Sequence, residues 1–116
     1  MDIISGKIVK GRGLGKKMGF PTLNIPYNGE LRGVFAAKVL IDGKSYPAAV
    51  SVGSRPTIND ESVFCEAYLL DFDGTVDGEI EVELLEKIRD IEKFKDLEEL
   101  KRQIAKDVEF VKMKLC

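Results

Sequence analysis

The sequence predicts a mainly β protein whose antiparallel strands close into a barrel, with one amphipathic helix at the C-terminal end. Three observations support this fold class. Most of the chain consists of short β-rich runs bounded by turn residues, no helical pattern lies between those runs, and the last twenty residues change to a helical period. At 116 residues the chain has the size of one domain, so we expect residues 1–116 to form a single unit with its barrel over about residues 1–94.

Five runs have the alternation and the β-branched and aromatic content of strands: residues 3–9, 34–41, 45–52, 63–70 and 79–88. Asp42-Gly43, between the second and third runs, is the two-residue signal of a type I′ hairpin. Strands joined by such short turns are antiparallel. Closure into a barrel is the usual way in which a sheet of this kind removes its exposed edges.

The C-terminal segment has the period of a helix. Asp96, followed by Glu99 three residues later, has the spacing of a capping box. Apolar residues then recur at spacings of three and four and form one stripe: Leu97, Leu100, Ile104, Val108, Val111 and Leu115. We therefore expect a helix over about residues 97–115 that packs its apolar stripe on the barrel.

Composition excludes several classes of function. The chain has no histidine, which excludes Ser-His-Asp and Cys-His catalytic groups and histidine metal ligands. The net charge of -2 provides no general attraction to nucleic acid or to a membrane. Two cysteines, Cys65 in an apolar run and Cys116 at the last position, are typical of a reduced protein. Since no signal-peptide pattern and no apolar run of about 20 residues is present, we expect a cytoplasmic protein.

A basic, glycine-rich segment follows the first predicted strand. Glycines occupy positions 6, 11, 13, 15 and 19, with four lysines and an arginine between them. Glycines let backbone N–H groups approach an anion closely, and lysines add positive charge. The spacing matches neither a P-loop nor a dinucleotide-binding fingerprint. A phosphate-binding loop and a flexible, solvated loop both fit this composition.

An extended segment comes directly after the glycine-rich segment. Pro21 fixes its own φ and moves the preceding residue out of the helical region, so the chain through Thr22 and Asn24 should be extended. The Thr22 hydroxyl and the Asn24 amide oxygen then point the same way, as two hard-oxygen ligands for Mg²⁺ carried by nucleotide phosphates. A turn motif at a strand end, with these side chains bonded to nearby backbone, fits the same residues.

Glu66 is the only charged residue in the apolar run of residues 63–70. Its own face of the strand holds Phe64, Tyr68 and Leu70, so burial of that face would desolvate the carboxylate and suit it to act as a general base. An outward-facing glutamate beside a lysine is the alternative. The absence of histidine favours a carboxylate as the base.

Taken in order, these segments resemble the riboflavin kinases, which occur as the C-terminal module of bacterial FMN/FAD-synthesising enzymes and as free-standing eukaryotic enzymes. The similar segments cover nearly the whole chain: residues 6–24 (GKIVKGRGLGKKMGFPTLN), 33–37 (GVFAA), 52–57 (VGSRPT), 65–74 (CEAYLLDFDG), 88–94 (IRDIEKF) and 96–107 (DLEELKRQIAKD). The resemblance implies a six-stranded antiparallel Greek-key β-barrel with a C-terminal helix. It also implies transfer of the terminal phosphate of a nucleoside triphosphate, with ATP expected, to the ribityl 5′-hydroxyl of riboflavin to give FMN.

The same resemblance implies roles for individual residues. Glu66 would be the general base, and Thr22 and Asn24 would hold Mg²⁺ or another divalent cation with the phosphates. The nucleotide would be bound by Gly11, Gly15, Lys16, Lys17, Gly19 and Thr22. The flavin would be bordered by Asn24, Arg89, Glu92 and Phe94, the last three in a second loop.

The chain departs from the family pattern in three respects. Asp77 stands near the nucleotide where the family often has an aromatic residue, and Glu92 stands near the flavin where some relatives have a basic one. The nucleotidyltransferase domain of the bifunctional enzymes is absent, so we expect a monofunctional kinase. Its expected partners are riboflavin/FMN and ATP/ADP, with CTP as a second possible donor; we expect a monomer that binds no nucleic acid and no membrane.

Two functions of other classes also fit a barrel of this size. A barrel that binds RNA or single-stranded DNA through its basic loop would need aromatic residues for stacking, and residues 5–19 contain none. A non-catalytic flavin-binding barrel would have no need of Thr22, Asn24 and Glu66 together.

Overall fold

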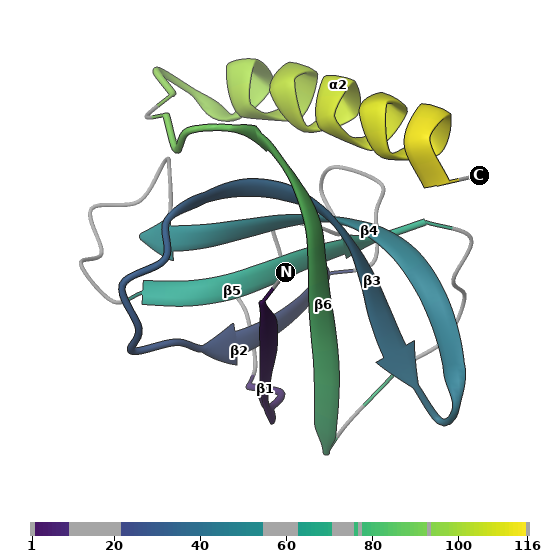
Figure 1. The fold of residues 1–116 in the computed structure, drawn as a ribbon. Coiled ribbons are helices and arrows are strands. Elements are labelled where there is room, and N and C mark those ends of the chain that lie inside the picture. The colour runs from purple at the N-terminus through teal and green to yellow at the C-terminus, as the bar shows by residue number, and fades with distance from the viewer. Residues whose placement is uncertain are drawn as a thin grey trace.

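The computed structural model describes residues 2–9, 22–54, 63–70, 76, 78–92 and 94–115, and within these residues the chain forms six strands and one helix (Figure 1). The strands are β1 (Ile3–Lys7), β2 (Thr22–Pro26), β3 (Gly33–Ile41), β4 (Lys44–Ser54), β5 (Val63–Leu69) and β6 (Glu79–Arg89), and the helix is α2 (Leu97–Leu115). The helix has the predicted bounds. Five strands match the predicted runs to within two residues, and β2 is the extended segment predicted after the glycine-rich one.

The strands form one antiparallel sheet in the order β1-β6-β3-β4-β5-β2. Its two edge strands, β1 and β2, approach each other where Val9 pairs with Asn24, whose carbonyl oxygen accepts a 2.8 Å hydrogen bond from the Val9 N–H. The sheet is therefore a nearly closed barrel. This arrangement confirms the predicted antiparallel Greek-key barrel with a C-terminal helix.

The turn between β3 and β4 has the predicted type I′ conformation. Asp42 and Gly43 have φ values of 49° and 80°, and Ile41 pairs with Lys44 on either side of them. Positive φ at both central residues defines the type I′ turn, whose twist matches that of the two strands it joins. This turn therefore fixes the register of the β3–β4 hairpin.

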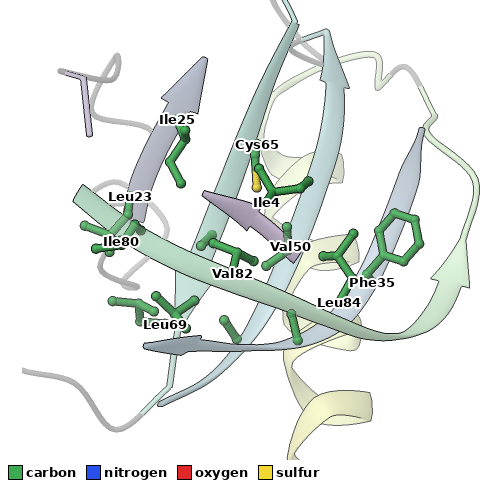
Figure 2. Packing of buried hydrophobic residues seen from close by; sticks show 14 of the residues in the cluster. Ile4, Leu23, Ile25, Phe35, Val50, Cys65, Leu69, Ile80, Val82 and Leu84 are labelled. Atoms are coloured by element: carbon green, nitrogen blue, oxygen red, sulfur yellow. The ribbon is translucent and has the colours of Figure 1, made fainter. Parts of the chain in front are cut away.

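Alternate residues of each strand fill the barrel. Figure 2 shows Leu23 and Ile25 of β2, Val50 of β4, and Val82 and Leu84 of β6 among the buried side chains of this core. On β5, Cys65, Ala67 and Leu69 also belong to this core. They alternate along the strand with Phe64, Glu66 and Tyr68. Because side chains alternate along a strand, Glu66 must face away from the barrel interior.

A second apolar cluster lies between the outside of the barrel and α2, which contacts β4 and β3 (Figure 1). It joins sheet residues to the predicted helical stripe: Ala36, Ala49, Tyr68 and Leu70 with Leu100, Ile104, Val108 and Val111. The helix begins with the predicted cap, because the Glu99 N–H donates a 2.9 Å hydrogen bond to Asp96 Oδ1. No helix among the described residues is both long and apolar enough to span a membrane.

Closure of the barrel depends on a glycine in β1. A Cβ atom built on Gly6 would lie 2.5 Å from Ile25 Cγ2 of β2, and that methyl group stands on a β-branched, fully buried side chain. Such a contact cannot be relieved without moving one of the two edge strands.

We expect Gly6→Ala to lower the free energy of unfolding by about 1–3 kcal/mol, because the added methyl group overpacks the contact between β1 and Ile25. Urea denaturation followed by circular dichroism measures this change. Ser5→Ala, at the neighbouring exposed position, is the control and should stay within about 0.5 kcal/mol of the original protein. Equal stability of the two variants would contradict this account of barrel closure.

Candidate active site

The pairing of β2 with β5 places Asn24 directly opposite Glu66. Ser51 of β4 lies opposite Glu66 on its other side, so a row of three polar side chains crosses three strands. The next row on the same face contains Thr22 and Tyr68, which also pair. Strand register therefore brings together the predicted base and both predicted metal ligands, from segments more than 40 residues apart in the chain.

Asn24 carries a buried oxygen atom that lacks a partner. The side chain is 5% exposed, and its Oδ1 atom accepts no hydrogen bond within the described part of the chain. A buried acceptor left in this state costs about 1–3 kcal/mol. Asn24 lies within β2, and among the described residues its side-chain oxygen bonds to no backbone group, which is not the pattern of a turn motif. A buried amide oxygen in this state is suited to bind a ligand, such as a cation, that would take the place of the missing hydrogen-bond donor.

Glu66 is buried although it faces outward from the barrel. It is 4% exposed, and Tyr68 Oη lies 3.4 Å from Glu66 Oε2, as a long hydrogen bond donated by the tyrosine. The outward-facing direction of the alternative is therefore found, but the glutamate is shielded from solvent; its neighbouring lysine stays a prediction. Glu66 is thus a buried carboxylate with a hydroxyl donor beside it, the kind of group that can serve as a general base.

Cys65 does not compete with Glu66 as a reactive group. Its side chain points into the barrel and is fully buried, and this burial, followed in effect by the negative charge of Glu66, raises the pKa of the Cys65 thiol to about 12. The thiolate is the nucleophilic form of cysteine, so this residue is inert near neutral pH.

A second polar group joins the end of β6 to α2. The Arg89 guanidinium forms two hydrogen bonds with the Asp107 carboxylate, Nε to Oδ1 at 3.0 Å and Nη2 to Oδ2 at 2.8 Å. Gln103 Nε2 also donates to Asp107 Oδ1, at 3.2 Å. The Arg89 cation lies 5.7 Å from the centre of the Phe94 ring, which brings two of the predicted flavin-binding residues into contact.

The two polar groups border one small cavity between α2 and the barrel. Its volume is about 20 Å³, enough for one water molecule. Its lining includes Ser51 and Tyr68, from the rows around Glu66, together with Arg89 and Asp107. The cavity is therefore lined by residues near the predicted base and by one predicted flavin-binding residue.

The structure also places four residues of the predicted site. Thr22 begins β2 and is half-buried, Glu92 is exposed, and Phe94 packs against the cluster under α2. Arg89 is the last residue of strand β6, so its predicted position in a loop is wrong. The remaining residues lie outside the described part of the chain, and their roles stay predictions: Gly11, Gly15, Lys16, Lys17, Gly19 and Asp77.

Asp107 received no role from the sequence, although one signal was available. It lies three residues after Ile104 and four before Val111, on the stripe that packs against the barrel. A charged residue on such a stripe needs a partner when it is buried. The pattern does not say which residue that partner is.

The comparisons of sequence agree on one family. Residues 3–115 match the family model described as riboflavin kinase. The bifunctional riboflavin kinase/FMN adenylyltransferase of Haemophilus influenzae is 40% identical over 114 residues, which are 94% of this chain and 37% of that protein. The RNA-binding riboflavin kinase RibR of Bacillus subtilis is 36% identical over 115 residues, 96% of this chain and 50% of that protein.

A solved structure supports the same assignment. The crystal structure of riboflavin kinase from Trypanosoma brucei aligns with a TM-score of 0.59 and 25% identity, over 97% of this chain and 78% of that one. The chain thus spans between about a third and a half of the two curated relatives described above.

We expect Cys65 to resist alkylation in the folded protein, because at pH 8 a thiol with a pKa of about 12 is ionised in only about one molecule in ten thousand. In a Cys116→Ser variant, which leaves Cys65 as the sole cysteine, iodoacetamide should add no mass under native conditions. The same variant in guanidinium chloride should be fully modified, which serves as the control. Native modification at the rate of an exposed thiol would contradict the burial of Cys65.

Proposed function

The chain belongs to the riboflavin kinase family, and we propose that it transfers the terminal phosphate of a nucleoside triphosphate to the ribityl 5′-hydroxyl of riboflavin, giving FMN. The observation that supports this function best is the buried pair formed by Asn24 and Glu66 across β2 and β5. It offers a proton acceptor and a cation ligand side by side, and a phosphoryl transfer to an alcohol needs both.

Glu66 is the general base of the proposed reaction. Its carboxylate accepts the proton of the riboflavin 5′-hydroxyl as that oxygen bonds to the terminal phosphorus, and the bond from phosphorus to the nucleoside diphosphate breaks. The Tyr68 hydroxyl donates a 3.4 Å hydrogen bond to Glu66 Oε2 and so helps to orient the carboxylate. Burial of the pair keeps water, the competing nucleophile, away from the phosphate.

Asn24 and Thr22 suit a divalent cation, with Mg²⁺ expected. The buried Asn24 side-chain oxygen, which accepts no hydrogen bond from the described residues, is the kind of hard ligand that Mg²⁺ prefers. Thr22 lies two residues earlier on the same face of β2. Bound there with the nucleotide phosphates, the cation would neutralise phosphate charge.

The two substrates would lie on either side of this pair. We propose ATP as the donor, bound through Thr22 and through the predicted residues of the glycine-rich segment, Gly11, Gly15, Lys16, Lys17 and Gly19. We propose that Arg89 and Phe94 border the flavin, with Glu92 beside them. The contact of the Arg89 cation with the Phe94 ring supports this second assignment, because both present flat surfaces at one edge of the site.

Of the activities named for the relatives, we propose only the kinase activity for this chain. It spans 37% of the bifunctional relative, and we propose a monofunctional kinase activity for these 116 residues. It spans 50% of the relative named as RNA-binding, and we propose no nucleic-acid partner for it. A monomer in the cytoplasm without a membrane partner also stays a prediction.

We expect Glu66→Gln to reduce the turnover number for FMN formation by about 10²–10⁴-fold, because the amide cannot accept the proton of the attacking hydroxyl. Chromatography of mixtures of protein, riboflavin, Mg²⁺ and either ATP or CTP measures FMN. Riboflavin affinity, read from quenching of its fluorescence, should change by less than about threefold, since the shape of the side chain is kept. Glu83→Gln, at an exposed position of β6, is the matched control and should keep full activity.

Two results would count against this function. If Glu66→Gln forms FMN as fast as the original protein, Glu66 is not the base. If the original protein binds riboflavin but forms no FMN with either nucleotide, the alternative of a non-catalytic flavin-binding barrel replaces the kinase.

We expect Asn24→Leu to separate function from stability. Leucine has the same number and branching of side-chain heavy atoms as asparagine, and it removes a buried oxygen that accepts no hydrogen bond within the described part of the chain, so the free energy of unfolding in metal-free buffer should stay equal or rise by about 1–3 kcal/mol. FMN formation should fall at least about tenfold at a fixed Mg²⁺ concentration, because a cation ligand is lost. A marked loss of stability, with activity kept, would show that Asn24 is a structural residue.

A further inference from the structure

The ion pair that joins β6 to α2 is supported by further hydrogen bonds on both of its partners. Each of the three Arg89 guanidinium nitrogens donates a hydrogen bond: Nε and Nη2 to Asp107, and Nη1 to the Asp90 carbonyl oxygen at 3.1 Å. Gln103 Nε2 donates a third hydrogen bond to Asp107, at the oxygen Oδ1 that also accepts from Arg89 Nε. A guanidinium bonded in this way has its plane fixed in both tilt and rotation.

Burial of the Asp107 carboxylate is energetically unfavourable by itself. It is 3% exposed, and it interrupts the apolar stripe on which Ile104 and Val111 pack against the barrel. Two well-packed apolar residues in place of a buried ion pair are often as stable or more stable. Stability of the packing between helix and barrel therefore does not account for an acid at this position, whereas a need to orient Arg89 does.

The oriented guanidinium shares a cavity with a residue of the proposed reaction centre. Arg89 and Asp107 line the same small cavity as Tyr68, the residue bonded to Glu66. The Arg89 cation also lies against the Phe94 ring. A shift of the Arg89 guanidinium would therefore change the surface that meets the flavin in the proposed function.

We infer that Asp107 is a positioning residue for riboflavin: from α2 it holds the Arg89 fork in the orientation that the flavin meets. This role rests on the proposed function, in which Arg89 borders the flavin. Because the fork is oriented before the substrate arrives, binding costs less conformational entropy. Asp107 acts through Arg89 and has no part in the proton transfer itself, so its loss should affect riboflavin binding more than the turnover number.

The test compares Asp107→Asn with a control that weakens the same packing without touching the polar link. Val111→Ala is that control, since Val111 is fully buried in α2 and belongs to the apolar cluster. Riboflavin Kd from fluorescence quenching, KM and kcat from FMN formation, and the melting temperature are measured for each variant. The Arg89→Ala protein and the Arg89→Ala/Asp107→Asn protein complete a double-mutant cycle.

We expect Asp107→Asn to raise both the riboflavin Kd and KM about tenfold to a hundredfold, with kcat within about threefold. Val111→Ala should lower the melting temperature but leave Kd and KM unchanged. In the Arg89→Ala background, Asp107→Asn should have no further effect on riboflavin Kd. If Asp107→Asn does not fold, Gln103→Met, which removes one donor from Asp107 at a half-exposed position, should raise Kd about threefold.

Unchanged riboflavin Kd in Asp107→Asn, or in Gln103→Met where that variant is needed, would overturn the inference. So would a change in Kd that Val111→Ala reproduces, since the effect would then come from the packing of the helix. Failure of the proposed function is a separate result: the original protein would form no FMN, while the comparison of riboflavin Kd values would still decide the role of Asp107.

Discussion

The register between β2 and β5 is the constraint on which the rest of the site depends. It places Asn24 opposite Glu66 on the outside of the barrel, while their neighbours in sequence, Leu23, Ile25 and Cys65, fill the inside. A slip of one residue would exchange the two faces of β2, burying polar groups in the core and exposing apolar ones. The apolar core of the barrel therefore also fixes the geometry of the polar pair, so stability of the fold and assembly of the site are set by the same pairing.

The outer face of the barrel has two parts with different chemistry. One part is apolar and is covered by α2, and the neighbouring part carries Glu66 and Asn24. Tyr68 belongs to both, because it packs in the cluster under the helix and donates to the Glu66 carboxylate. The helix thus reaches the site through Tyr68 and through the ion pair of Asp107 with Arg89. Within the part of the chain that the structure describes, the buried Asn24 side-chain oxygen accepts no hydrogen bond, and this unfavourable feature lies where the proposed chemistry occurs.

Much of this could be predicted from sequence, for reasons that differ by element. The helix was predicted at both ends because an apolar stripe and a cap residue depend only on local spacing. Glu66 was identified because a single charge interrupts an apolar strand. Alternation did not find β2, whose five residues include a polar Asn24 and end at a proline. Nor did it find the partner of Asp107, since Arg89 lies 18 residues away on another element and no local period encodes such a contact.

The central claim is that phosphate transfer takes place at the Asn24–Glu66 pair. A crystal structure of the protein with FMN, ADP and Mg²⁺ tests it most directly. The account predicts Mg²⁺ about 2.0–2.1 Å from Asn24 Oδ1 and the phosphate-bearing oxygen of the ribityl chain within hydrogen-bonding distance of Glu66. A complex in which both ligands are bound at another face of the barrel, with the Asn24 oxygen still without a partner, would contradict it.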